Sequence, residues 1–372
     1  MTGGAGAEVA GTPGVLVRGT GTGAGGGARV AAWDALRGAA VALVILRHAW
    51  PDVFPGAGVV GVVMFFALSG HLITGLLVDE AGATGRVDLR RFWWRRIRRL
   101  VPALLAFVAV FVVVTLTLDP LGGDRGTLPR TVAVALTYTA NIPYVGLVGV
   151  SPAIYHLWTL ATEEQFYLVW PLVVLLAVRS RRTVAGLVLA GVAALALTVA
   201  TVAWFRATPD AAYPLPTSWL VCFVIGGLAR VTQDRWARAA TGRVAVVAAL
   251  LLLAVLSVVD VRGHAATYLV VAPAVSVATV VLVHAGRTHL RTPRWLTPLV
   301  ALGTVSYAAY LWNYPLTMWL RPELGVAAGP VGAVATVAAA TASWWLVERP
   351  VREHGRRRDA AVARGRRVPA PG

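Results

Sequence analysis

The segment RGAAVALVILRH, residues 37–48, decides how this chain can fold. It is almost entirely apolar, but it begins with Arg37 and ends with an arginine followed by His48. In an α-helix, a step of eleven residues returns to within about 20° of the same face and advances roughly 16 Å. If this helix crosses a bilayer, Arg37 lies at one interface and His48 near the middle. An ionisable side chain at that depth is costly, and its presence indicates a functional site.

The composition is that of a membrane protein with many spans. Of its 372 residues, 57% are hydrophobic and 14% are charged, whereas soluble domains contain roughly 45–50% apolar and about 25% charged residues. The formal net charge is +17, and all 34 basic residues are arginines. These arginines lie between the apolar segments, so positive-inside topology explains them better than nucleic-acid binding, and we expect membrane lipids and no nucleic acid as partners. The single cysteine, Cys222, excludes an intrachain disulfide.

The apolar segments predict an all-α integral membrane protein with about ten transmembrane helices. They lie at 36–54, 58–78, 100–118, 156–178, 183–205, 217–230, 244–260, 266–284, 296–319 and 326–347. Residues 131–150, which include Tyr138, Asn141 and Pro143, suit a re-entrant or outer-face piece packed within protein. With the N-terminus inside, the cytoplasmic segments then hold 28 of the 34 arginines, as the positive-inside rule favours. We therefore expect both termini to be cytoplasmic.

Six arginines fall outside these cytoplasmic groups. They are Arg47, Arg125, Arg130, Arg206, Arg262 and Arg321. The expected organisation is a disordered cytoplasmic Gly/Ala-rich tail at 1–30, a membrane domain at 31–353 and a basic cytoplasmic tail at 354–372 that contacts anionic lipids.

The most basic segment is RRFWWRRIRRLVPALL, residues 90–105, with six arginines among residues 90–99. One interpretation is a topology anchor with an aromatic belt at the cytoplasmic interface. The other is a phosphate-binding clamp, because the arginine fork matches phosphate oxygens. The residues alone favour neither.

A later helix, HLWTLATEEQFYLVWP at 156–171, carries two adjacent carboxylates, Glu163 and Glu164. Its spacing places His156, Glu163 and Tyr167 on one face. Glu163 lies about 10 Å below His156 by helix rise, which brings it near the expected depth of His48. We predict a pair in which Glu163 orients the His48 imidazole as a general base. The alternative is a structural buried ion pair.

Two further helices contribute polar side chains. The segment GVVMFFALSGHLITGLL at 61–77 contains Ser69 and His71, and SYAAYLWNYP at 306–315 contains Ser306, Tyr310 and Asn313. His71 is either a packed histidine or part of the site, and the second group either lines a substrate path or joins helices. The candidate substrate-lining residues are Ser69, His71, His156, Glu164, Tyr167, Tyr310 and Asn313.

Together these segments resemble the membrane-bound acyltransferase 3 family of bacterial inner-membrane O-acyltransferases. The resemblance covers roughly residues 33–353 and rests on WDALRGAAVALVILRHAW, FFALSGHLIT, RRIRRLVPALL, HLWTLATEEQFYLVWP, SYAAYLWNYP and VERPVRE in this order. It implies a multi-pass protein of the bacterial plasma membrane. The implied reaction moves an acyl group, usually acetyl from acetyl-CoA, to a hydroxyl of a sugar, glycan, lipid-linked sugar or macrolide-like natural product.

By position, the resemblance implies a role for each of five residues. Arg37 and His48 match the essential Arg–His motif, Arg96 and Arg99 match the arginine pair proposed to hold the CoA phosphates, and Glu163 matches the first glutamate of the EEQFY motif. We therefore expect His48 and Glu163 to be catalytic and Arg37, Arg96 and Arg99 to bind acyl-CoA, without a metal.

Four positions depart from the family pattern. Val63 stands where an acidic residue is usual, His71 where an aromatic is usual, Trp219 where an arginine is common, and Asn313 where the YLWH motif has its histidine. These departures affect positions expected to contact substrate. Two other functions stay open from the sequence: a transporter or flippase for a glycoside or lipid-linked sugar, and a divergent member without catalysis. The acceptor, the acyl chain, the side of transfer, the oligomeric state and the choice between general base and acyl-histidine are also open.

Overall fold

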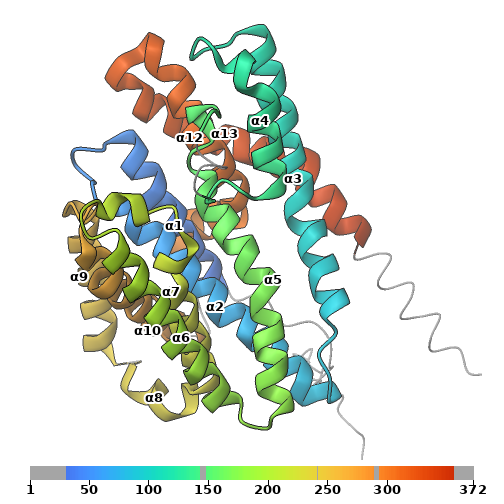
Figure 1. The fold of residues 1–372 in the computed structure, drawn as a ribbon, viewed down its shortest axis with the longest axis vertical. Helices are drawn as coiled ribbons and strands as arrows, with labels where there is room; N and C mark the ends of the chain where they lie inside the picture. Colours follow the sequence, from blue (N-terminus) through green and yellow to red (C-terminus); the bar gives the residue numbers. More distant parts are fainter. Residues whose placement is uncertain (1–30, 143–147, 241, 289–292, 356–372) are drawn as a thin grey trace, which may run out of the picture.

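In the computed structural model, the described residues are 31–142, 148–240, 242–288 and 293–355. They form helices and no strands (Figure 1). The expected tails at 1–30 and, beyond residue 355, at the C-terminus lie outside this part of the chain. The α-helices are α1 (Ala31–Ala49), α2 (Ala57–Thr84), α3 (Leu89–Thr117), α4 (Asp124–Thr137), α5 (Leu157–Arg179), α6 (Thr183–Trp204), α7 (Leu220–Val231), α8 (Gln233–Ala240), α9 (Arg243–Val258), α10 (Ala272–Thr288), α11 (Thr297–Thr304), α12 (Ser306–Leu324) and α13 (Ala328–Ser343).

Short 3-10 and π turns extend or link these helices. They are η1 (Pro152–Ile154), η2 (Pro209–Ala212), η3 (Pro216–Ser218), η4 (Thr267–Val271), η5 (Arg294–Leu296), η6 (Gly325–Ala327) and η7 (Trp344–Glu348). The π turns η4 and η7 continue directly into α10 and out of α13.

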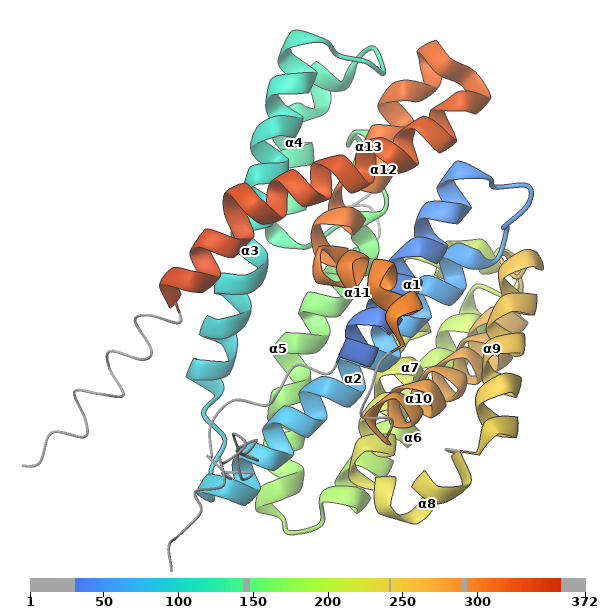
Figure 2. The ribbon, with the colours of Figure 1, turned by 180° about the vertical axis from the view of Figure 1, so that it is seen from behind.

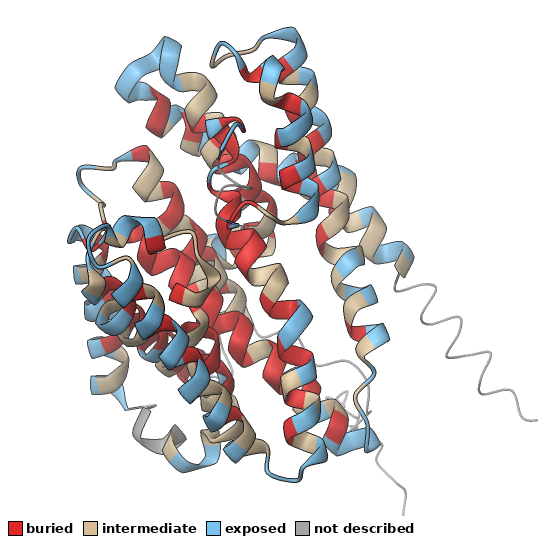
Figure 3. Ribbon diagram, in the orientation of Figure 1, coloured by how far each residue is buried: buried red, intermediate tan, exposed pale blue. Residues whose placement is uncertain are grey.

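Helices α1, α2 and α5 run through the centre of the molecule (Figures 1 and 2). On one side lie α6 to α10, and on the other lie α3, α4, α12 and α13. Buried residues concentrate on the central helices, and the outward faces of the flanking helices are exposed (Figure 3). Helix α6 shows this pattern, since Val188, Leu189, Val192 and Leu195 are all exposed apolar residues. Such faces are suited to contact with lipid.

Six helical stretches of the described chain are long and apolar enough to cross a membrane. They are Ala57–Thr84, Leu89–Thr117, Leu157–Arg179, Thr183–Trp204, Thr267–Arg287 and Ser306–Gly355. The structure has a helix at each of the ten apolar segments found in the sequence. Helix α1 is not one of the six, because it carries Asp34, Arg37 and Arg47. Charged side chains within a span are costly unless they have a partner or reach water.

Two boundaries differ from the sequence expectation. Helix α1 ends at Ala49, shortly before Pro51, because proline disfavours continuation of the helix before it. The segment expected as one helix at 296–319 is divided at Val305 into α11 and α12. This break allows α11 to follow α1, after which α12 runs on beside α13 (Figure 2).

Glycines allow α1 to approach α11 closely. A Cβ added to Gly303 would lie 1.8 Å from the carbonyl oxygen of Asp34, and one added to Gly38 would lie 1.9 Å from that of Leu299. Small residues at such contacts let helix backbones pack against each other within membranes. Because Gly38 follows Arg37, this contact also sets the position of the Arg37 side chain against the start of α12.

Residues 131–137 of the segment predicted not to span belong to helix α4, and the turn that follows, as far as residue 142, packs within the protein, whereas Pro143 lies outside the described residues. Asn141 is buried and donates hydrogen bonds from Nδ2 to Thr162 at 3.1 Å and to Gln165 at 2.8 Å. Gln165 donates in return to the carbonyl oxygen of Tyr138 at 3.2 Å. The turn after α4 is therefore fixed to the middle of α5, beside the two adjacent carboxylates.

Candidate active site

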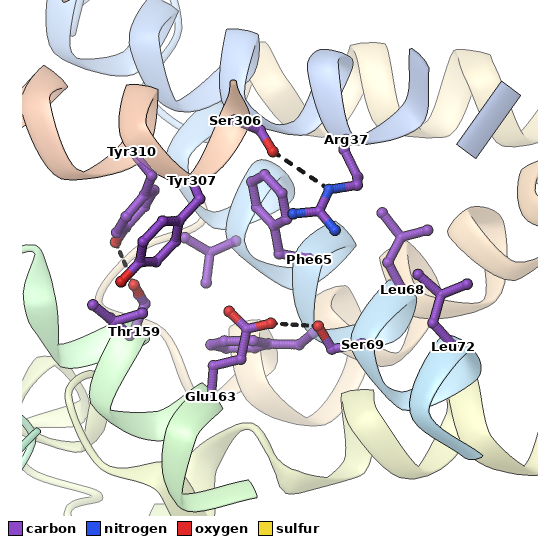
Figure 4. Close-up of a pocket in the computed structure, with 13 residues that line it drawn as sticks. Arg37, Phe65, Leu68, Ser69, Leu72, Thr159, Glu163, Ser306, Tyr307 and Tyr310 are labelled. Carbon is purple, nitrogen blue, oxygen red and sulfur yellow. Dashed lines mark hydrogen bonds between the residues drawn. The ribbon is translucent and has the colours of Figure 1, made fainter. Parts of the chain in front are cut away.

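A pocket surrounds Arg37 at the centre of the helix bundle, and we call it the Arg37 pocket (Figure 4). Its lining comes from α1, α2, α5 and α12 and comprises Arg37, Val62, Phe65, Phe66, Leu68, Ser69, Leu72, Thr159, Leu160, Glu163, Ser306, Tyr307 and Tyr310. Arg37 Nε donates a hydrogen bond to Ser306 Oγ at 3.3 Å. Glu163 faces this pocket from α5 (Figure 4).

Glu163 takes part in a hydrogen-bonded group with Ser69 and Tyr167. Both hydroxyls donate to Glu163 Oε1, and they lie 2.8 Å from each other. The guanidinium of Arg96 lies over the Tyr167 ring at 3.7 Å from its centroid, a cation–π contact. Trp93 donates to the carbonyl oxygen of Tyr167 at 3.0 Å, which fixes α3 against α5. Arg96 is therefore held near the Arg37 pocket.

The arginines near this pocket repel one another. Arg99 interacts electrostatically with Arg37, Arg96 and Arg352. The Nε atoms of Arg96 and Arg99 are buried and have no hydrogen-bond partner within the described chain. A group of guanidiniums with unused buried donors is suited to bind an anion with several charges.

Glu348, the last residue of the π turn η7 that follows α13, also belongs to this cluster, which the sequence did not indicate. Its side chain is buried, and its Oε2 accepts a hydrogen bond from Arg352 at 3.1 Å. It also interacts electrostatically with Arg99 and Arg37. The spacing of four residues between Glu348 and Arg352 in the VERPVRE segment was the available signal, because such residues share one helix face.

A second, larger pocket contains His48, and we call it the His48 pocket. Its lining residues are Val44, Arg47, His48, Pro51, Pro55, Gly58, Val59, Val62, Tyr155, His156, Trp158, Thr159, Asp210, Ala211, Tyr213, Pro214, Arg262, Tyr310, Tyr314 and Arg321. The His48 ring lies edge-on to Tyr314, with 4.9 Å between the ring centroids. The Tyr314 ring thus packs against the imidazole on the pocket side.

Asn313 determines which nitrogen of His48 carries the proton. Thr336 Oγ1 donates to the carbonyl oxygen of Gly332 at 2.6 Å, so it accepts the hydrogen bond from Asn313 Nδ2 at 3.2 Å. The amide oxygen of Asn313 then faces His48 Nδ1, which lies 2.5 Å away and must donate. His48 Nε2 is consequently the unprotonated nitrogen, with its lone pair free to accept a proton.

The predicted pair of His48 and Glu163 is wrong. Glu163 is bound by Ser69 and Tyr167, whereas His48 is bound by Asn313. Helix rise gave similar depths for the two residues, but depth does not specify the direction in which each helix faces. α5 turns Glu163 toward α2, and α1 turns His48 toward α12. A neutral amide therefore occupies the place expected for the carboxylate.

The two pockets adjoin at three residues that line both, namely Val62, Thr159 and Tyr310. The Tyr310 hydroxyl is hydrogen-bonded to Thr159 and donates to the carbonyl oxygen of His156 at 2.8 Å. This small polar group separates the side with the arginine cluster from the side with His48. The placement of Tyr310 and Asn313 agrees with the expectation that α12 contributes polar lining.

The remaining candidate residues differ in position. His156 lines the His48 pocket, with its ring centroid 5.4 Å from those of Tyr310 and Tyr314. Glu164 is near Arg96 and Arg99 but lines neither pocket.

His71 is buried against Trp33 and lines neither pocket. This position fits the packed-histidine alternative. Of the other departures from the family pattern, Val63 is fully buried, and Trp219 is buried among aromatic rings and donates to the carbonyl oxygen of Tyr213 at 2.8 Å. Neither lines the two pockets.

The Arg37 pocket, beside the arginine cluster, and the His48 pocket thus adjoin inside a bundle of apolar helices. The family model for the acyltransferase domain of the acyltransferase 3 family matches residues 30–349 of this chain. The chain therefore belongs to this acyltransferase family. The match spans every helix that lines either pocket.

Among curated proteins, the chain is similar to O-acetyltransferases. It is 29% identical over 351 residues to the peptidoglycan O-acetyltransferase OatA of Listeria monocytogenes, covering 87% of this chain and 56% of that protein. It is 26% identical over 368 residues to the O-acetyltransferase OatA of Staphylococcus aureus, covering 87% of this chain and 57% of that protein. The chain spans little more than half the length of these relatives. No solved structure matches it.

Proposed function

We propose that this protein is an O-acyltransferase that moves an acyl group, most simply acetyl, from acyl-CoA to a hydroxyl of a glycan or glycoside. The observation that carries the proposal is the pair of adjoining pockets. One pocket lies beside an arginine cluster, the other contains a histidine with a free Nε2, and the two share Val62, Thr159 and Tyr310. The family and the O-acetyltransferase relatives support this reaction class.

In this proposal, acyl-CoA binds from the side of the arginine cluster. Arg96 and Arg99 hold the phosphates, because their guanidiniums offer unused donors and the phosphates relieve their mutual repulsion. Arg37 extends the same positive surface into the Arg37 pocket. The pantetheine chain follows this pocket past Ser69 toward Tyr310, and rotation of Tyr310 admits the thioester to His48.

His48 then acts as the general base on the acceptor. Nε2 accepts the proton of the acceptor hydroxyl while its oxygen attacks the thioester carbonyl. The C–S bond breaks, and the proton passes from the imidazolium to the leaving thiolate of CoA. Asn313 holds Nδ1–H throughout and stabilises the imidazolium that forms. Glu163 is proposed to act on the donor side, where it holds Ser69 and Tyr167 and balances the charge of Arg37 and Arg96.

The topology proposed with this function has ten spans, both termini in the cytoplasm and a location in the bacterial plasma membrane. Support comes from the helices at all ten apolar segments and from the distribution of arginines. In this orientation, the arginine cluster faces the compartment in which acyl-CoA is made. His48 lies toward the opposite face, where a glycan acceptor is reached.

The test is acyl transfer by the purified protein in lipid nanodiscs, supplied with radiolabelled acetyl-CoA and an extracted glycan fraction. His48→Ala is expected to lower the transfer rate by about 10²- to 10⁴-fold, the usual contribution of a general base. His354→Ala is the matched control, because this exposed histidine lies outside both pockets. Undiminished transfer in His48→Ala would contradict the mechanism. Movement of a glycoside across vesicles without acyl-CoA would favour a transporter instead.

A further inference from the structure

Three of the six arginines that fall outside the cytoplasmic groups meet in one place. Arg47, Arg262 and Arg321 come from the end of α1, the loop before η4 and the end of α12, and all three line the His48 pocket. The only carboxylate among the residues described as lining this pocket is Asp210. The lining of the His48 pocket therefore has more arginines than carboxylates, whereas Asp52 and Asp260 line the adjoining surface pocket that shares Arg47 and Arg262.

Arg262 is already neutralised. Its Nε and Nη2 donate to the two oxygens of Asp210 at 2.7 and 3.1 Å, and its guanidinium lies 4.5 Å from the centroid of the Tyr213 ring. Burial lowers the pKa of Arg262, but the hydrogen bonds to Asp210 and the nearby tyrosines raise it more, so that the pKa lies above its ordinary value. This ion pair forms one fixed wall of the pocket.

Arg47 and Arg321 have no such partner. Within the described chain, neither makes a hydrogen bond or an ion pair, although both interact electrostatically with His48. The aliphatic part of Arg47 packs against Gly58, because a Cβ there would lie 3.0 Å from Arg47 Cγ. Its stem is thus fixed while its guanidinium stays available. Two available guanidiniums next to a general base are suited to an oxyanion on the substrate.

We propose that the acceptor is an anionic sugar, whose carboxylate or phosphate binds Arg47 and Arg321 while a neighbouring hydroxyl reaches His48 Nε2. This inference rests on the proposed function, which supplies the acceptor. The rest of the pocket fits a sugar ring, since Tyr155, Trp158 and Tyr314 provide aromatic surface around the polar groups. The anion also places the reacting hydroxyl, because its contacts with two arginines from different helices fix the orientation of the sugar ring.

Binding without acyl-CoA tests this inference separately from transfer. The probes are nitrophenyl β-glucuronide and nitrophenyl β-glucoside, which differ by one carboxylate, measured by calorimetry on the protein in zwitterionic nanodiscs. The glucuronide is expected to bind at least tenfold more tightly than the glucoside. This preference should decrease as ionic strength rises, because partly exposed charges are screened.

The double variant Arg47→Gln/Arg321→Gln is expected to lose the preference, and Arg206→Gln is expected to keep it. Arg206 is the matched control, because it is exposed and lies outside the pocket. Arg321→Gln alone changes an exposed side chain that folding does not need, and it should lose part of the preference. Equal binding of the two glycosides by the wild type, or a preference that survives the double variant, would overturn the proposal.

A lipid headgroup offers the same oxyanion chemistry. The measurement is therefore repeated in nanodiscs that contain phosphatidylglycerol. Loss of the glucuronide preference there would show that the arginines bind lipid, and it would overturn the assignment to the acceptor. Selective glucuronide binding by a protein that transfers no acetyl group would instead leave this inference standing and contradict the proposed function.

Discussion

Removal of the Asn313 side chain provides the sharpest test of the proposed mechanism. Asn313 is 1% exposed and connects His48 Nδ1, at 2.5 Å, to Thr336, at 3.2 Å. Asn313→Ala leaves the imidazole without the acceptor that fixes its tautomer and its orientation. When the imidazolium forms, this hydrogen bond becomes one to a charged group, which contributes about 1.5–3 kcal/mol. Since each 1.36 kcal/mol corresponds to tenfold in rate, kcat is expected to fall roughly 10- to 150-fold.

Single-turnover transfer from saturating radiolabelled acetyl-CoA measures this effect, and donor binding is measured in parallel. Asn313→Asp keeps an oxygen at the same position, so it should recover most of the lost rate. Thr336→Val removes only the second anchor of the amide and should cost less than Asn313→Ala. A normal kcat in Asn313→Ala, alongside an inactive His48→Ala, would refute the orienting role. Equal loss in the Ala and Asp variants would assign the effect to packing.

Two further predictions concern the arginines proposed to bind acyl-CoA and the close contact between α1 and α11. Arg96→Ala/Arg99→Ala is expected to raise the KM for acyl-CoA at least tenfold with a smaller change in kcat. Arg95→Ala, at an exposed arginine, is the control and should leave KM unchanged. Equal KM values in steady-state assays of the two variants would argue against phosphate binding by Arg96 and Arg99. Gly303→Ala places a Cβ 1.8 Å from a backbone oxygen of α1. It is expected to destabilise the protein by about 1–3 kcal/mol. In the control, Gly82→Ala, the added Cβ meets nothing within 4 Å, so this variant should be as stable as the wild type or more stable. Thermal unfolding in detergent measures both variants, and equal melting temperatures would contradict the close contact.

Most of the fold could be predicted from the sequence, because a bilayer leaves few choices. Backbone groups in lipid must be satisfied within each segment, so every long apolar run becomes a helix. That residues 131–150 do not span the membrane stays a prediction, made from their polar residues and from the arginines that follow them. The break at Val305 was not predicted, although Gly303, Thr304 and Ser306 flank it within the apolar run. The chain turns at Val305, between α11, which packs against α1, and α12.

The site was predictable residue by residue but not in its pairings. Spacing along one helix shows which side chains share a face, as it does for Glu163 and Tyr167 on α5. It does not show how two helices are rotated against each other. The contacts of α1 with α12, which join Arg37 to Ser306 and His48 to Asn313, depend on that rotation. The most instructive residue is Asn313, a departure from the expected YLWH motif that the structure places within hydrogen-bond distance of His48.

The narrow boundary between the two pockets has a consequence for how such proteins diversify. Among the described residues, only Val62, Thr159 and Tyr310 line both pockets. Under the proposed function, substitutions elsewhere in the His48 pocket can therefore change acceptor preference without altering the surface that meets the donor, and the reverse also holds. Donor preference and acceptor preference can then change independently of each other within one helical bundle. Engineering can exploit the same separation, since a new acceptor range requires changes on only one side of Tyr310.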